Sequence, residues 1–105
     1  MNGIAALNDE LRTTGKDGQV VITRAVAALG EPLVAKICAA VRAFSDFNSD
    51  NGPHGEHDFG SMDVDGYALF WKIDYYDPTL TFGSEDPSDP NVTARVLTVL
   101  LQEEY

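Results

Sequence analysis

The sequence has one cysteine, few basic residues and no long apolar run. Cys38 has no second cysteine to pair with, so no disulfide can form within the chain, which is typical of a reducing compartment. No run of about 18 apolar residues occurs, and the first residues lack the basic and apolar segments of a signal peptide. The sequence therefore predicts a cytoplasmic protein without a membrane span.

Basic residues are scarce in one part of the chain only. Seven Lys and Arg stand against 17 Asp and Glu, a formal net charge of −10. Residues 1–45 hold four acids and five bases, whereas residues 46–105 hold thirteen acids and two bases. Nucleic acid and anionic membranes are poor partners for such a chain, and a basic protein surface is a better one.

Length and apolar content predict a single folded domain over residues 1–105. A chain of 105 residues, 44% of them hydrophobic, can bury roughly 60–68% of its unfolded surface. There are no internal repeats and no linker between separate units, so one core must serve the whole chain.

A β-hairpin at about 56–64 and 67–76 is the clearest element. Asp65-Gly66 suits a two-residue type I′ turn, because both turn residues need a positive φ. This register places Gly60 opposite Trp71, where the absent side chain leaves room for the indole. It also places His57 opposite Asp74, as an ordinary cross-strand pair.

Helices are expected on either side of this hairpin. Apolar residues at helical spacing predict helices over about 3–13 and 32–44, with Pro32 at a first helical position. Residues 19–23 contain a short β-branched run and predict a strand, and residues 24–29 predict a brief helix. Residues 77–90 predict an ordered, acidic loop. A last helix over about 90–103 would begin at Pro90, after the capping residue Asp89.

These elements predict an α+β fold with a small antiparallel sheet centred on the hairpin. The helices would pack against its apolar face, because a sheet with one apolar face must cover it.

Several segments together resemble a known family. They are NDELRTTG, VVITRAVAALG, EHDFG, WKIDYYD, GSEDPSDP and RVLTVLLQEEY. The ordered series is similar to the bacterial domain-of-unknown-function family 3768. The resemblance implies small cytoplasmic proteins often carried on plasmids and other mobile elements, and it brings no reaction and no catalytic residues. The family tends to have Tyr where this chain has His54, so His54 is not carried over as a site residue.

A cation site is one alternative for the acidic segment. Residues 46–52 place oxygen ligands at the first, third and fifth positions, like the start of an EF-hand calcium loop. The sixth position is Asn51 in place of Gly, and the twelfth is His57 in place of Glu. Asp and Asn also favour turns in their own right, so we expect no calcium and no metal here.

His54, Glu56, His57 and Asp58 supply residue types that bind zinc or transfer protons. No helix presents the two histidines on one face, and no paired cysteines, nucleophile elbow or phosphate-binding loop accompany them. Cys38 fits a core position, where a free cysteine behaves as a small hydrophobe. We therefore expect neither a cofactor nor an enzyme.

The leading hypothesis is an acidic inhibitor that mimics DNA. Proteins that bind duplex DNA present Lys and Arg to its closely spaced phosphates, and a rigid acidic domain can fill such a groove. The target would be a host DNA-binding defence complex, either a CRISPR effector (anti-CRISPR activity) or a restriction enzyme (antirestriction). The predicted partner-binding residues are Asp58, Asp63, Asp65, Asp74, Tyr76, Asp77, Glu85, Asp86 and Asp89.

The alternative is a non-enzymatic adaptor of plasmid maintenance. Aromatic residues of the hairpin, of which Tyr75 and Tyr76 point to opposite faces, would contact the partner. Such binding would respond weakly to salt, unlike that of a mimic.

Overall fold

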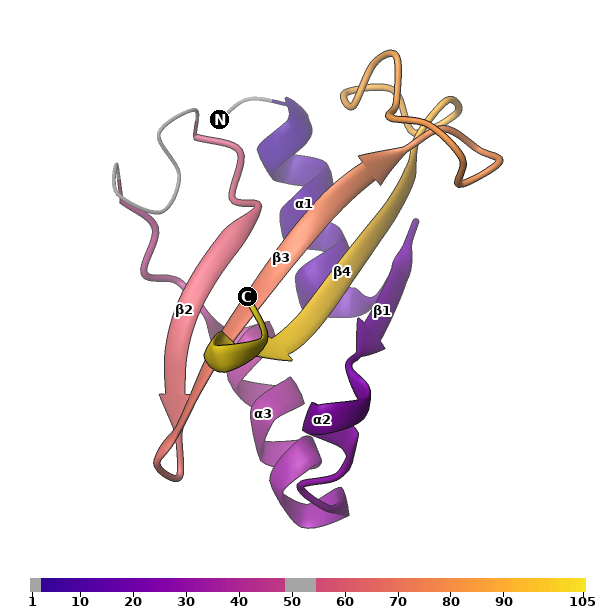
Figure 1. Cartoon of the computed structure of the whole chain (residues 1–105). Helices are drawn as coiled ribbons and strands as arrows, with labels where there is room; N and C mark the ends of the chain where they lie inside the picture. The colour runs from indigo at the N-terminus through magenta and orange to yellow at the C-terminus, as the bar shows by residue number, and fades with distance from the viewer. Residues whose placement is uncertain (1–2, 49–54) are drawn as a thin grey trace.

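The computed structural model describes residues 3–48 and 55–105 as an α+β domain, which confirms the predicted class (Figure 1). The elements in chain order are α1 (Gly3–Thr14), β1 (Gln19–Ile22), α2 (Arg24–Ala27), α3 (Glu31–Ala43), β2 (Phe59–Val64), β3 (Tyr67–Tyr76), β4 (Ala94–Leu101) and the short 3₁₀ helix η1 (Gln102–Glu104). The helices predicted over 3–13 and 32–44 are thus confirmed as α1 and α3.

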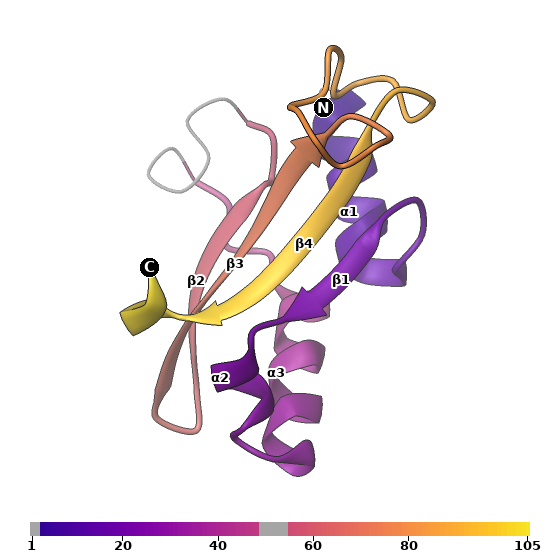
Figure 2. The ribbon, with the colours of Figure 1, turned by 45° about the vertical axis from the view of Figure 1, so that its right-hand side comes forward.

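The four strands form one sheet in the order β1-β4-β3-β2. β4 pairs antiparallel with β3 and parallel with β1. The sheet is therefore mixed, and the prediction of a wholly antiparallel sheet is wrong at the β1 edge. The three α-helices lie on one side of the sheet and leave the other side open (Figure 2).

The hairpin and its register are confirmed. Asp65 and Gly66 have φ values of 52° and 87°, as a type I′ turn requires. Gly60 pairs with Trp71, and a Cβ at Gly60 would lie 2.2 Å from the indole nitrogen. The absence of a side chain at Gly60 is what allows the indole to lie against β2.

The predicted helix over about 90–103 is wrong, because most of this segment is the strand β4. β4 is a central strand between β1 and β3, and its apolar run is nearly continuous: one face is buried, the other is half-buried, and the last three residues are all buried. Such a run cannot be distinguished from a buried helix by periodicity. The β-branched residues Val96, Thr98 and Val99 favour the strand.

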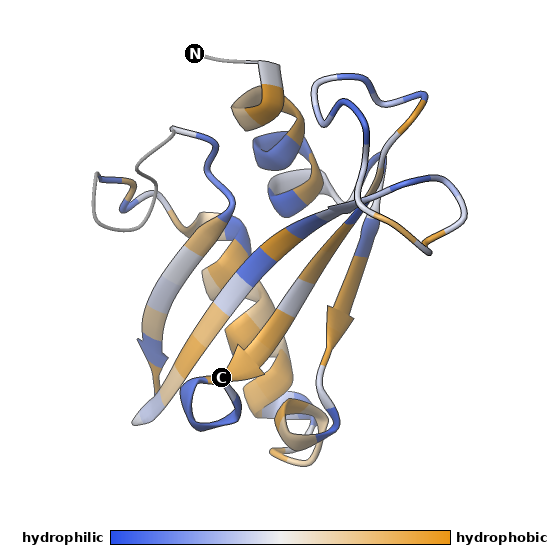
Figure 3. Ribbon diagram, turned by 45° about the horizontal axis from the view of Figure 1, so that its top comes forward, coloured by the Kyte–Doolittle hydropathy of each residue, from blue (hydrophilic) through white to orange (hydrophobic). Residues whose placement is uncertain are grey.

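The core lies between the sheet and the helices α1 and α3. Leu69 and Trp71 of β3, Leu97 and Val99 of β4, and Ile37 of α3 are all fully buried. The central strands and α3 are mostly hydrophobic, whereas the long loop between β3 and β4 is mostly hydrophilic (Figure 3). That loop projects beyond the end of the sheet and carries the candidate site.

Candidate functional site

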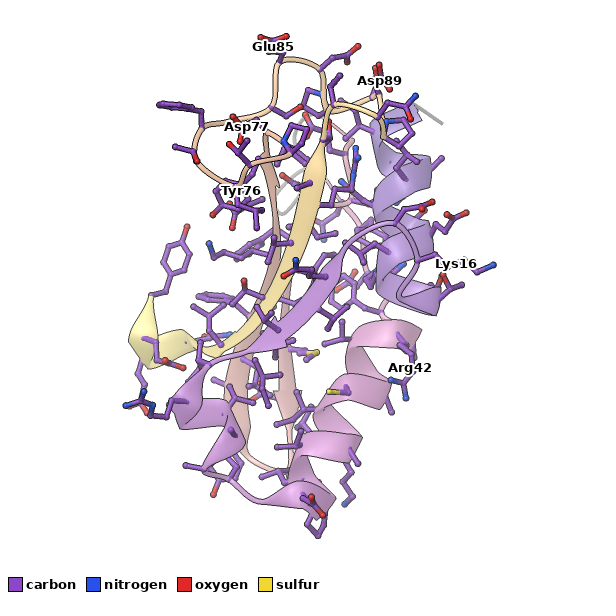
Figure 4. All side chains as sticks on the ribbon, turned by 90° about the vertical axis from the view of Figure 1, so that its right-hand side faces the viewer. Lys16, Arg42, Tyr76, Asp77, Glu85 and Asp89 are labelled. Atoms are coloured by element: carbon purple, nitrogen blue, oxygen red, sulfur yellow. The ribbon has the colours of Figure 1, made fainter. Side chains whose placement is uncertain are left out.

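The structure divides the nine predicted partner-binding residues among separate places. Five of them lie at the end of β3 or in the loop of residues 77–93, which we call the acidic loop: Tyr76, Asp77, Glu85, Asp86 and Asp89. Figure 4 shows Tyr76, Asp77, Glu85 and Asp89 at this end of the molecule. Asp63 and Asp65 lie at the hairpin turn, at the opposite end of β3 (Figure 1). The nine residues therefore do not form one continuous wall, and the acidic loop is where they are concentrated.

Asp58 and Asp74 lie between these two ends. The Asp58 carbonyl accepts a hydrogen bond from the Ile73 amide, which continues the pairing just beyond β2. Asp74 lies on the open face of the sheet and accepts a hydrogen bond of 2.7 Å from Lys72 Nζ. Lys36 pairs with Asp65 at 2.9 Å in the same way. Half-exposed and exposed pairs of this kind reduce the charge that a partner meets at Asp65 and Asp74.

Asp77 holds the first turn of the acidic loop. Its carboxylate accepts hydrogen bonds from the Thr79 hydroxyl at 2.8 Å and from the amides of Thr81 and Phe82 at 3.1 and 3.4 Å. The hydrogen bond from Thr79, followed by that from Thr81, lowers the pKa of Asp77. The carboxylate is thus fixed in place and stays charged at neutral pH.

Asp86 and Asp89 hold the second part of the loop in the same manner. Asp86 accepts hydrogen bonds from the Ser88 hydroxyl at 2.6 Å and from the Ser88 amide at 3.1 Å, and these bonds lower its pKa. Asp89 accepts one from the Asn91 amide at 2.9 Å. Side chains of Asp bind their own backbone in this way in many turns, so these acids order the loop that carries them.

Arg95 supports the acidic loop from beneath. Its side chain comes from β4, is only 2% exposed, and donates from Nη2 to the Pro87 carbonyl and from Nε to Asn8 Oδ1 at 2.9 Å. Its guanidinium lies 5.3 Å from the centre of the Tyr75 ring. Burial lowers the pKa of Arg95 from its usual value, but an arginine stays charged at neutral pH. The loop is therefore tied to both the sheet and α1.

A polar cluster completes this support. Asn8 Nδ2 donates to the Tyr75 hydroxyl at 2.8 Å and to the Glu56 carbonyl at 2.9 Å. The Tyr75 hydroxyl in turn donates to Glu56 Oε1 at 2.7 Å. Burial, followed by the hydrogen bond to Glu56, raises the pKa of Tyr75. Tyr75 and Tyr76 point to opposite faces, as predicted, and Tyr75 is the one on the helix-covered face, where it bonds Asn8 and Glu56.

The acidic loop surrounds a hollow of ≈ 450 Å³. It is lined by Asp77, Pro78, Phe82, Gly83, Glu85 and Val92. Phe82 is 71% exposed and Leu80 is 48% exposed, which is unusual for large apolar side chains so close together. Among the described residues, no Lys, Arg or His forms an ion pair with Asp77, Glu85, Asp86 or Asp89. The hollow thus combines unpaired charge with an exposed aromatic ring.

The predicted pair of His57 with Asp74 is wrong. His57 has a φ of 56°, so the chain leaves the strand geometry just before β2. Its Nδ1 lies 3.0 and 3.1 Å from the two carboxylate oxygens of Asp9 on α1. Its ring stacks on Phe47 with centroids 3.9 Å apart. The histidine therefore ties β2 to α1 and does not cross the hairpin.

No metal centre is seen in the described ranges 3–48 and 55–105, where no group of three or more His, Cys, Asp or Glu could hold an ion. The calcium-like segment 46–52 and the zinc-like His54 fall largely or wholly outside the described residues. None of the helices in the described ranges has the length and apolarity needed to cross a bilayer.

Three residues that hold the acidic loop or the start of β2 in place were not predicted from the sequence: Arg95, Asn8 and Asp9. The sequence did hold a sign that Arg95 is buried, because it is the one charged residue within the mostly apolar segment that becomes the central strand β4. The sequence held no such sign for Asn8 and Asp9, since they look like the polar residues of any amphipathic helix.

The comparisons with known proteins identify a family and no activity. The family model described as "Protein of unknown function (DUF3768)" matches residues 22–104, from the end of β1 to η1. No curated protein and no solved structure matches the chain significantly. The family match covers most of the chain, and the chain therefore belongs to the DUF3768 family.

Proposed function

We propose that this protein is an acidic inhibitor, without catalytic activity, that binds a basic protein surface through the acidic loop. One observation carries the proposal: Asp77, which is fixed by hydrogen bonds, and Glu85 line a hollow with an exposed Phe82, and neither acid forms an ion pair within the described residues. A partner rich in Arg would meet charge and an aromatic face together, which favours both ion pairing and cation–π contact.

The more specific form of the proposal is mimicry of DNA. Carboxylates held on a rigid loop can occupy the Lys and Arg positions that normally contact phosphates. The net charge of −10 would also speed encounter with a positive groove. The family resemblance implies carriage on mobile elements, which benefit from blocking a CRISPR effector or a restriction enzyme of their host. The inhibitor would act in the cytoplasm, where those complexes work.

The test removes two charges from each end of the molecule. Glu85→Gln with Asp89→Asn neutralises the acidic loop, and Asp63→Asn with Asp65→Asn neutralises the hairpin turn as a matched control. We expect the loop variant to lose most of its inhibition of target-DNA binding by purified CRISPR effectors or restriction enzymes, and the control to retain it. Equal inhibition by both variants, or unchanged DNA binding at excess wild-type protein, would refute the proposal.

A second candidate function is supported by the open face of the sheet. Phe59, Phe70 and Tyr105 cluster there, with ring centroids 5.0 to 6.4 Å apart, and Tyr105 is 77% exposed. An adaptor of plasmid maintenance could bind a protein through this aromatic cluster. Its affinity would change little with salt and would fall on Phe70→Ala, whereas the mimic would retain its affinity in that variant.

A further inference from the structure

The strand β1 forms one edge of the sheet, and no strand of the described residues pairs with its outer side. Figure 4 faces this edge, and β1 crosses in front of the other strands there. The Thr23 amide donates to the Val99 carbonyl of β4 at 3.1 Å. Because backbone groups alternate between the two sides of a strand, the amides and carbonyls of Val20 and Ile22 point away from β4. We call this outer side of residues 19–22 the β1 edge.

The side chains at the β1 edge are apolar and open to solvent. Val20 is 48% exposed and Val21 is 39% exposed, and the two lie on opposite faces of the strand. Proteins commonly protect an edge strand with charges, proline or a bulge, since an unprotected edge pairs readily with another strand. β1 carries no charge, no proline and, in its regular register with β4, no bulge. The β1 edge is therefore open to a further strand.

The other edge of the sheet is protected against a second copy of this chain. β2 carries Asp63, and Asp58 and Asp65 lie just outside its two ends. A second copy would bring the same acids to that edge, and like charges opposite each other destabilise a strand pair. Residues 1–45, which include β1, hold four acids and five bases. Two copies can therefore approach along β1 with less repulsion than along β2.

The sequence of the β1 edge matches itself in the antiparallel direction. In a two-fold symmetric pair of antiparallel strands, one residue faces its own copy. With Val21 in that position, Val20 lies opposite Ile22 of the second copy, and these two residues exchange both of their outward backbone hydrogen bonds. The side chains then meet as Val with Val and Val with Ile. Such β-branched pairs stabilise a sheet.

The charges at the two ends of β1 fit the same register. Asp17 and Arg24 are exposed, and neither forms an ion pair within the described residues. Centring the pairing on Val21 places Arg24 of one copy within one position of Asp17 of the other. Centring it one residue earlier would place Arg24 opposite Lys16 of the second copy. Opposite charges therefore favour the register centred on Val21.

We propose that the β1 edge binds a second copy of this chain, with Val21 at the centre of the pairing, so that one sheet continues across both copies. The helices of both copies lie on the same side of this sheet, and the two acidic loops lie at its opposite ends. Because β1 is only four residues long, the interface is smaller than a standard one and the dimer is weak. The proposal does not rest on the acidic loop or on any function assigned to it.

Disulfide trapping tests the register. Since Cys38 is the only cysteine, Val21→Cys in a Cys38→Ser background gives one thiol per chain, at the position that faces its own copy. Residues opposite each other in a non-hydrogen-bonded pair have Cα atoms about 4.5 Å apart, within the range of a disulfide. The control is Val20→Cys in the same background, which is also exposed but lies opposite residue 22 of the second copy.

The readout is the rate at which covalent dimers form with oxidised glutathione, followed on a non-reducing gel. We expect Val21→Cys to form them at least about tenfold faster than Val20→Cys, because only the first thiol is held next to its own copy. Equal rates for the two variants, or a faster rate for Val20→Cys, would overturn the proposal.

Sedimentation velocity with two lysine variants distinguishes the β1 edge from the open face of the sheet. Val21→Lys places like charges opposite each other in the dimer, whereas Thr98→Lys places the same charge on the same face, one strand further from the edge. We expect the wild type to form dimers at about 1 mM protein, Val21→Lys to raise the Kd at least about tenfold, and Thr98→Lys to leave it nearly unchanged. A wild type that stays monomeric at that concentration, or dimers weakened equally by both variants, would contradict pairing through β1.

Discussion

Gly60→Ala tests the packing of the hairpin against the core. A Cβ at residue 60 would lie 2.2 Å from Trp71 Nε1, 2.6 Å from Trp71 Cε2 and 2.8 Å from Phe44 Cζ. Trp71 is fully buried and contacts Phe44 and Phe47 edge to face, with centroids 5.4 and 6.1 Å apart. The indole therefore cannot move away from residue 60 without displacing the rings of Phe44 and Phe47.

The expected cost follows from this overlap. Inserting a methyl group into a well-packed core costs about 1–3 kcal/mol. For a domain of this size each kcal/mol lowers Tm by roughly 4–8 °C, so Gly60→Ala should lower Tm by about 5–20 °C. Thermal unfolding followed by circular dichroism measures this directly.

Gly3→Ala is the control, because nothing lies within 4 Å of a Cβ added at that position in α1. Its Tm should equal or slightly exceed that of the wild type, since alanine favours a helix more than glycine does. A Gly60→Ala protein as stable as the wild type would refute the claim that this glycine makes room for the indole.

Three further predictions concern the groups around the site. Since burial and the hydrogen bond to Glu56 raise the pKa of Tyr75 above its usual 10.0, its stabilisation is complete below about pH 10 and declines as the pH rises further. Tyr75→Phe should lower the free energy of unfolding by about 0.5–1.5 kcal/mol at neutral pH and remove that alkaline decline, as urea titrations at several pH values would reveal; an unaltered alkaline decline would count against it. A double-mutant cycle between His57 and Asp9, using His57→Ala and Asp9→Ala, should give a coupling of about 0.5 kcal/mol or more, whereas the His57 and Asp74 cycle should give none; the reverse result would restore the cross-strand pair. Asp77→Ala should speed amide hydrogen exchange at Thr81 and Phe82, which Asp77 holds, and leave exchange at Trp71 unchanged; unaltered exchange in the loop would mean that Asp77 does not order it.

The sequence predicted the local elements well where one signal was decisive. The Asp65-Gly66 turn determined the register of the whole hairpin, because a two-residue loop allows only one pairing of the flanking strands. α1 and α3 followed from apolar spacing and, for α3, from Pro32 near its start. Each of these signals acts within a few residues.

The sequence failed where the structure depends on distant contacts. Val96 to Leu101 looked helical because the apolar run is nearly continuous, and the place of β4 in the middle of the sheet is a property of the whole fold. His57 pairs with Asp9, 48 residues away, and Arg95 with Asn8, 87 residues away. Nothing in the local pattern distinguishes these polar residues from others on the surface.

The acidic residues illustrate the same limit. Their number in the C-terminal part was plain from the sequence, but β3 alone separates Asp63 and Asp65 from Asp77. The strand rises about 3.3 Å per residue, so the two groups lie at opposite ends. The acidic loop keeps several acids together, because three of them bind the loop's own backbone.

A competition titration tests the central claim most directly. Labelled duplex DNA is bound to a purified CRISPR effector or restriction enzyme, and the protein is added at low and at high salt. If the acidic loop replaces DNA phosphates, the protein will displace the DNA, and its affinity will fall steeply as salt rises. Displacement that does not change with salt, or no displacement at saturating protein, would contradict the account.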